Sequence, residues 1–119
     1  MDPRHLQRIT TIENLFALTF DPGKKNLPHP KDEQTMKIIK NLKKIDGYIS
    51  KNAPKFPIAK IAKADLAILR LAVYELIIKP TQPYKAVINE AVELSKEFGG
   101  DKSYMFVNGV LGKVVDQKK

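Results

Sequence analysis

The sequence has 119 residues, 43% of them hydrophobic, which suffices for one domain with a packed core and excludes wholesale disorder. No apolar run reaches the roughly 18 residues that span a membrane, no signal-peptide core is present, and the absence of cysteine excludes disulfides and thiolate metal sites. The formal net charge of +8 favours a polyanionic partner, and we expect a soluble, cytoplasmic protein.

The first predicted element is a helix that ends at residue 20, because apolar residues recur in it at steps of three and four. Asp21-Pro22-Gly23 ends this helix, since proline and glycine both interrupt helical continuation. Residues 21–31 hold three prolines and one glycine and are predicted to form a loop. The apolar stripe of the helix consists of Leu6, Ile9, Ile12, Phe16 and Phe20.

A second helix is predicted across residues 38–49, with an apolar face and a basic face. The segment 24–63 holds eleven lysines against three acidic residues and carries the whole positive excess. Such a face either binds a polyanion, because lysines near phosphates release counterions, or only keeps the protein soluble. The apolar face comprises Ile38, Leu42, Ile45 and Ile49, and the basic face Lys37, Lys40, Lys44 and Lys51.

Residues 58–78 form the most apolar stretch and are predicted to be a helix buried in the middle of a bundle. Arg70 is the single arginine in this stretch, and we expect it to pair with Glu75 or Glu90 rather than to contact a ligand. The next helix is expected to end at Gly99-Gly100, a good helix terminator.

A last helix begins near residue 103, with Asp101 or Ser103 as candidate caps. No alternating strand pattern is present, and the predicted fold class is all-α, a compact bundle of about five to six helices with short connections. We expect two half-domains, residues 1–57 with the basic surface and residues 58–119 with the buried helix.

Catalytic and metal-binding constellations are absent from the sequence. His5 and His29 have no partner at metal-ligand spacing. Glu90, Glu93 and Glu97 repeat at helical spacing, which is more typical of a solvated face balanced by lysines than of paired catalytic carboxylates. We therefore expect no metal, no cofactor and no enzymatic activity.

Three segments of the chain resemble the NusB family of transcription antitermination factors. They follow one another in the order and spacing of the family, whereas residues 21–58 resemble it only in pattern and are short for it. The segments are Asp65–Leu76, like the central helix of the family, Pro83–Leu94, like its next helix, and Phe106–Leu111, like its closing signature.

This resemblance implies a two-part helical bundle that binds RNA during ribosomal RNA transcription. The implied ligand is boxA, a short single-stranded element of leader transcripts, and the implied partner is the ribosomal protein NusE. In this family, the protein and NusE together help load an antitermination complex on RNA polymerase. The family uses no cofactor, and both a monomer and a homodimer are open for this chain.

The resemblance also implies which residues meet RNA. The first helix of the family opens with an arginine-rich segment that meets phosphates, and here Leu6 interrupts this segment. Phosphate contacts tolerate exchange of position, so lysines of the second helix can compensate. Tyr104 is expected either to stack on an unpaired base or to be a half-buried tyrosine at a helix start. The expected RNA-binding residues are Arg4, His5, Arg8, Lys37, Lys40, Lys44, Lys85, Lys102 and Tyr104.

For the protein partner, the resemblance points to Phe16 and Phe20 on the first helix and to Asp65 on the central helix. Exposed aromatic anchors beside an acidic group suit a basic ribosomal protein. Their helical spacing equally allows both phenylalanines to be core residues. Phe106 lies on an apolar stripe and is expected in the core.

Two other functions remain open at this point. One is an RNA-binding domain like that preceding certain ribosomal RNA cytosine methyltransferases, which would require a cofactor-binding half in addition to these residues. The other is a purely protein-binding helical adaptor, whose lysines serve solubility. Salt dependence separates the adaptor from an RNA-binding protein, because binding through several lysines weakens steeply with salt.

Overall fold

The computed structural model describes residues 2–23 and 25–118, and every regular element in them is helical. The α-helices are α1 (Pro3–Phe20), α2 (Glu33–Lys40), α3 (Leu42–Asn52), α4 (Lys63–Val73), α5 (Tyr84–Phe98) and α6 (Ser103–Lys118). A short 3₁₀ turn, Ile58–Lys60, precedes α4, and a π-helical turn, Tyr74–Ile78, continues it. The all-α prediction is confirmed. Within the described residues, no helix is both long and apolar enough to cross a membrane.

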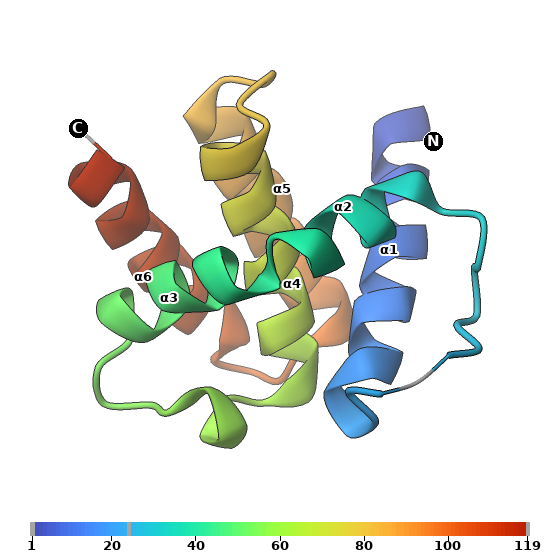
Figure 1. The fold of residues 1–119 in the computed structure, drawn as a ribbon. Coiled ribbons are helices and arrows are strands. Elements are labelled where there is room, and N and C mark those ends of the chain that lie inside the picture. The colour runs from blue at the N-terminus through green and yellow to red at the C-terminus, as the bar shows by residue number, and fades with distance from the viewer. Residues whose placement is uncertain (1, 24, 119) are drawn as a thin grey trace.

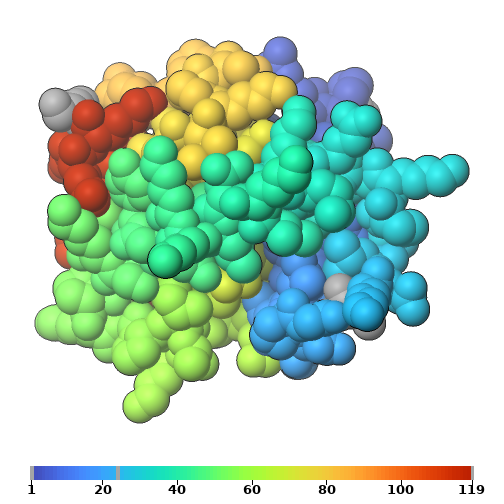
Figure 2. Space-filling view, in the orientation of Figure 1, coloured from blue at the N-terminus to red at the C-terminus, as the bar shows by residue number. Residues whose placement is uncertain are grey.

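Helix α4 lies in the centre of the bundle and contacts α1, α3, α5 and α6 (Figure 1). Its residues 65–73 are buried without interruption, as the apolar composition of this segment predicts. Helices α2 and α3 cross one face of the molecule, and Figure 2 shows their side chains as a band between those of α1 and those of α6. The lysine-rich segment therefore forms much of one surface.

The prediction of one continuous helix over residues 38–49 is wrong, because the chain breaks at Asn41 between α2 and α3. The Asn41 side-chain amide donates to the Lys37 carbonyl oxygen at 2.8 Å, and the Asn41 backbone N–H donates to the Ile38 carbonyl at 3.0 Å. Asparagine side chains compete with the backbone for such bonds and favour helix ends. The apolar residues Ile38, Ile45 and Ile49 still reach the core from both helices.

The predicted apolar stripe of α1 is also partly wrong. Leu6 is 51% exposed and Phe20 62% exposed, so the two ends of the predicted stripe lie outside the core, whereas Ile12 in its middle is buried. The face that α1 does bury includes polar residues, which a count of apolar positions cannot find. This face consists of Thr11, Ile12, Asn14, Leu15 and Leu18.

A buried hydrogen-bond network explains how α1 buries polar side chains. Asp32 caps α2 by accepting from the Thr35 backbone N–H at 3.2 Å, and the same carboxylate accepts from the hydroxyls of Thr35 and Thr11. The Asn14 amide nitrogen donates to the Thr35 hydroxyl and to the His29 carbonyl, both at 2.9 Å, and its oxygen accepts from the His29 N–H. The network ties α2 and the preceding loop to α1.

Replacing Asn14 with alanine is expected to lower the free energy of unfolding by about 2 kcal/mol, because it removes three hydrogen bonds and leaves buried groups without partners. Urea denaturation followed by circular dichroism measures this change. Asn89→Ala on the exposed face of α5 is the matched control and is expected to change stability little. Equal midpoints for the two variants would contradict the role assigned to the network.

Arg70 is paired, but not with the predicted partner. Its Nε and Nη2 donate to the two carboxylate oxygens of Asp46 on α3, both at 2.9 Å. Glu75 and Glu90, the expected partners, contact Arg8 and His5 of α1 instead. The ion pair therefore fastens α3 to the central helix, through a residue that is distant in sequence.

Helix α5 ends at Phe98, directly before the predicted terminator Gly99-Gly100. Gly99 has a φ of −98°, so the left-handed conformation that often favours glycine at this position is not the reason for it. A Cβ at Gly99 would lie 2.5 Å from the Ser103 hydroxyl oxygen and 2.7 Å from the Ser95 carbonyl oxygen. Close packing between the ends of α5 and α6 thus requires a glycine here.

Candidate nucleic-acid interface

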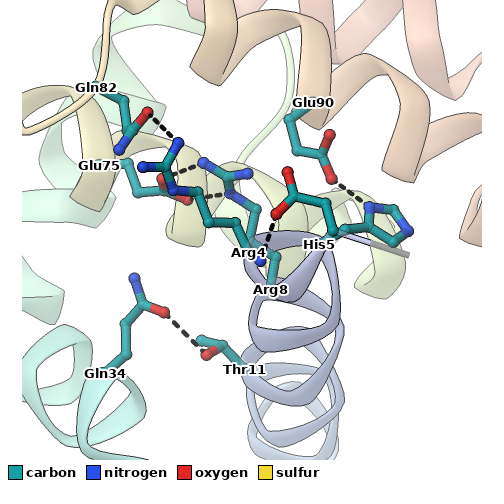
Figure 3. A network of polar contacts seen from close by, with 9 residues as sticks. Arg4, His5, Arg8, Thr11, Gln34, Glu75, Gln82 and Glu90 are labelled. Atoms are coloured by element: carbon teal, nitrogen blue, oxygen red, sulfur yellow. Dashed lines mark hydrogen bonds and ion pairs between the residues drawn. The ribbon is translucent and has the colours of Figure 1, made fainter.

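The first two turns of α1 place the Arg4 and Arg8 side chains beside Glu75 of the π-helical turn (Figure 3). Arg8 Nε and Nη2 donate to Glu75 Oε2 and Oε1 at 2.8 and 2.7 Å, in a two-pronged ion pair whose side chains are 11% and 12% exposed. The hydrogen bonds to Glu75 raise the pKa of Arg8. Glu75 neutralises Arg8, so this arginine anchors α1 to the end of α4 and offers little free charge to a phosphate.

His5 lies against α5, on the side that carries the glutamate stripe. Its Nδ1 contacts Glu90, and its Nε2 lies 3.4 Å from a Glu97 oxygen. The hydrogen bond to Glu90 raises the pKa of His5 above its ordinary value. Among the described residues, one glutamate of the stripe pairs with a lysine, Glu93 with Lys96 at 3.6 Å, so the predicted lysine-balanced face is in large part a binding surface for His5.

His5 is expected to stabilise the fold most at acidic pH. Its pKa in the folded protein is raised above the unfolded value of 6.5, so the stabilisation is complete below that pH and is lost as the pH rises through the folded pKa. We expect the Tm difference between the wild type and His5→Gln to be larger at about pH 5.5 than at about pH 8.5. Thermal melts at both pH values measure it, and an unchanged difference would contradict the ion pairs with α5.

A polar groove runs between α1, the start of α2 and the loop before α5. It consists of two adjoining cavities of about 260 and about 400 Å³, which share Gln7 and Gln34 in their walls. Arg4 lies in the smaller cavity, where its Nη1 donates to the Gln82 side-chain oxygen at 3.2 Å. The larger cavity is bordered by three exposed cations, Lys31, Lys37 and Lys79, and by the carboxylates of Asp32 and Glu33.

The groove brings together Arg4, Arg8 and Lys37 from the expected RNA-binding set. It adds Lys31 and Lys79, which the sequence interpretation missed. Lys31 belongs to the lysine-rich segment 24–63, and its place in that segment could have marked it as a candidate RNA-binding residue. Lys79 directly follows the π-helical turn at the end of the buried helix, and nothing in the local sequence shows that it borders the same cavity as Gln7 of α1. None of the three lysines lies within 4.0 Å of a carboxylate in the described part of the chain, which leaves their charges available to an anion.

The other expected RNA-binding residues lie outside this groove. Lys40 and Lys44 are exposed on either side of the Asn41 break, and neither forms an ion pair within residues 2–23 and 25–118. Lys85 is exposed in the first turn of α5, three residues after Gln82. Their positions leave all three lysines free to contact an extended ligand.

Lys102 and Tyr104 lie at the other end of α5, around the start of α6, and line neither cavity of the groove. The Tyr104 ring is partly exposed, and Lys96 Nζ lies 5.5 Å from its centroid. A cation beside an exposed ring suits a base-stacking platform and equally suits an ordinary surface tyrosine. The role of Tyr104 therefore stays a prediction.

An aromatic hollow, which the sequence interpretation missed, lies between the segment that follows α3 and helix α6. Phe106 packs edge-on against Phe56 with ring centroids 5.2 Å apart, in a hollow of about 270 Å³ that Lys55 and Lys113 border. Phe106 also packs against the core, as expected, but it is only partly buried. Phe56 is isolated in a proline-flanked segment of the sequence, and no periodicity there signals its partner.

The expected partner-binding residues lie near the carboxyl end of α1 and the start of α4. Phe16 and Phe20 are 40% and 62% exposed and pack edge-on with centroids 4.9 Å apart, so the core alternative is wrong. Lys63 Nζ lies 5.0 Å from the Phe20 centroid. Asp65 is only 7% exposed, and its Oδ1 has no hydrogen-bond partner among the described residues. The aromatic pair, rather than the carboxylate, dominates this surface.

Comparison with known proteins identifies the family of this chain. Residues 11–116 match the model of the NusB family. The transcription antitermination protein NusB of Lysinibacillus sphaericus is 44% identical over 125 residues, which cover 97% of this chain and 98% of that protein. The protein of the same name from Acetivibrio thermocellus is 48% identical over 81 residues, 68% of this chain and 56% of that protein. With several such relatives the match spans only about half of their length.

Solved structures agree with the family match. NusB of T. maritima superposes with a TM-score of 0.86 at 27% identity, covering 98% of this chain and 92% of that one. A structure described as antitermination factors NusB and NusE in complex with double-stranded RNA superposes with a TM-score of 0.80 at 22% identity, covering 98% and 99%. The second likeness concerns the fold alone.

Proposed function

We propose that this chain, which belongs to the NusB family, is an RNA-binding transcription antitermination factor that binds boxA-type single-stranded RNA together with NusE. The observation that carries the proposal is the groove at the start of α1, where Arg4, Lys31, Lys37 and Lys79 converge. Phosphates supply most of the affinity of such surfaces, because each neutralised phosphate releases counterions. This function needs neither catalysis nor a cofactor.

The RNA path that we propose starts at this groove and continues over exposed lysines of the neighbouring elements. Lys40 and Lys44 extend it along α2 and α3, and Lys85 extends it onto α5. His5 and Arg8 are assigned to positioning, because their charges are taken up by glutamates of the bundle. Lys102 and Tyr104 would contact RNA only if the strand also follows α5 to the start of α6.

The proposed NusE surface is the exposed pair Phe16 and Phe20. Aromatic side chains that pack on each other and remain exposed are typical hot spots, since a partner can bury them at low entropic cost. The buried Oδ1 of Asp65 has no partner within the described residues and would gain one if a donor from NusE reached it. A protein-only adaptor would use the same aromatic surface without any RNA, which makes it the second candidate.

A fluorescence-anisotropy titration tests the proposal, with a labelled boxA-like RNA, with and without NusE, at two salt concentrations. We expect binding that weakens steeply with salt and tightens when NusE is present. Phe16→Ala with Phe20→Ala is expected to abolish the tightening by NusE while leaving RNA binding by the chain alone unchanged. NusE binding that is insensitive to salt, with no RNA binding under any condition, would favour the adaptor and overturn the RNA proposal.

A further inference from the structure

We propose that the smaller cavity of the groove holds one unpaired base of the RNA and reads its edge through the side-chain amides of Gln34 and Gln82. This inference rests on the proposed function and adds sequence recognition to it. A site that only neutralises phosphates would have no use for the uncharged polar side chains that make up half of its lining.

Three glutamines from three different elements meet in this cavity: Gln7 from α1, Gln34 from α2 and Gln82 from the loop before α5. Figure 3 shows the Gln34 and Gln82 side chains on either side of the arginines. The remaining wall includes Thr81 and the neutralised pair of Arg8 and Glu75. Among the described residues, Arg4 forms no ion pair with a carboxylate, whereas the charge of Arg8 is paired with Glu75.

Two of the three glutamines are oriented by a hydrogen bond at one end. The Gln82 oxygen accepts from Arg4, and the Gln7 nitrogen donates to Asp32. The Gln34 amide lies 3.3 Å from the Thr11 hydroxyl, whose single proton is donated to Asp32 at 2.7 Å, so this contact does not fix the amide. The cavity therefore presents the –NH₂ group of Gln82 as a donor, the oxygen of Gln7 as an acceptor, and a Gln34 amide that offers either.

This combination suits a base better than a phosphate. A phosphate only accepts hydrogen bonds, so the Gln7 oxygen and the Glu75 carboxylate would repel it. The edge of every base offers donors and acceptors side by side, and glutamine amides are among the side chains that read such edges. Unstacked bases of single-stranded RNA are recognised in this way. The three lysines that border the adjoining, larger cavity would neutralise the phosphates flanking the bound base.

The test is an affinity profile over a set of single-stranded RNAs that each change one position of a boxA-like sequence, measured by anisotropy in the presence of NusE. For the wild type we expect one position at which a wrong base weakens binding about tenfold or more. In Gln34→Ala and in Gln82→Ala that discrimination is expected to fall to within about threefold, while the other positions keep their profile. Lys37→Ala is the matched control and is expected to weaken all RNAs alike.

Gln34→Glu serves as a second variant, because it keeps the size and the accepting oxygen of Gln34 but replaces the donor with an acceptor. It is expected to change which base is preferred at the same position. Amide variants that weaken every RNA equally, or that leave the profile unchanged, overturn the inference while the proposed function stands. A wild type that binds none of the RNAs overturns both.

Discussion

Replacing Arg8 with alanine is expected to lower the free energy of unfolding by about 3 kcal/mol. The substitution leaves the Glu75 carboxylate almost buried and without its counter-ion, and removing one partner of a buried ion pair costs several times more than an exposed pair contributes. It also releases the first helix from the end of α4, where the pair joins them (Figure 3). Urea denaturation at neutral pH measures the change.

A double variant tests whether the lost stability comes from the unpaired Glu75 carboxylate or from the loss of arginine packing. Arg8→Met with Glu75→Leu replaces both charges by apolar groups and is expected to recover much of the stability lost in Arg8→Ala. Arg4→Ala is the matched control in the same helix. Arg4 is exposed, and among the described residues its side chain donates one hydrogen bond, to Gln82, whereas the bond from its backbone N–H to Asp2 is kept in the variant. Equal losses in Arg4→Ala and Arg8→Ala would show that the pair with Glu75 does not hold the helix.

Reversing two charges, Lys40→Glu with Lys44→Glu, is expected to weaken RNA binding by about tenfold or more near 0.1 M salt and to leave the fold intact. Both lysines are exposed, and no ion pair of the described residues involves them, so the folded state loses no contact. Anisotropy measures the affinity, and the slope of log affinity against log salt is expected to become shallower. Thermal melts check that the fold persists.

The control for this variant is Lys60→Glu with Lys113→Glu, which makes the same change of net charge at exposed positions that the proposed RNA path does not include. It is expected to weaken RNA binding much less. If both double variants lose affinity equally, the positive charge acts through the whole molecule and not through the face of α2 and α3. If neither loses affinity, the basic face is not an RNA surface.

The sequence was sufficient to predict those features that depend on local pattern. A 3.6-residue period and breaks at proline and glycine predict the α-helices except for two features: the division at Asn41, and the start of the central helix, which begins at Lys63 after a separate 3₁₀ turn and not at residue 58. The unbroken apolar run predicts that α4 is buried. The resemblance of three segments to the NusB family predicted the family correctly, since residues 11–116 match its family model. The division into residues 1–57 and 58–119 stays a prediction, although α4 contacts both α1 and α3 across that boundary.

The sequence by itself determined the all-α class, the central helix and the segment that carries the charge, because backbone propensity and hydrophobic period are properties of neighbouring residues. Only the tertiary structure decided which polar groups meet. Arg8 finds Glu75, Arg70 finds Asp46, and Gln82 turns toward Arg4. Such pairs join residues that are far apart in sequence, and partners of the same charge lie at many other positions along the chain. The packing of the helices around α4 selects among them, and the same packing creates the groove.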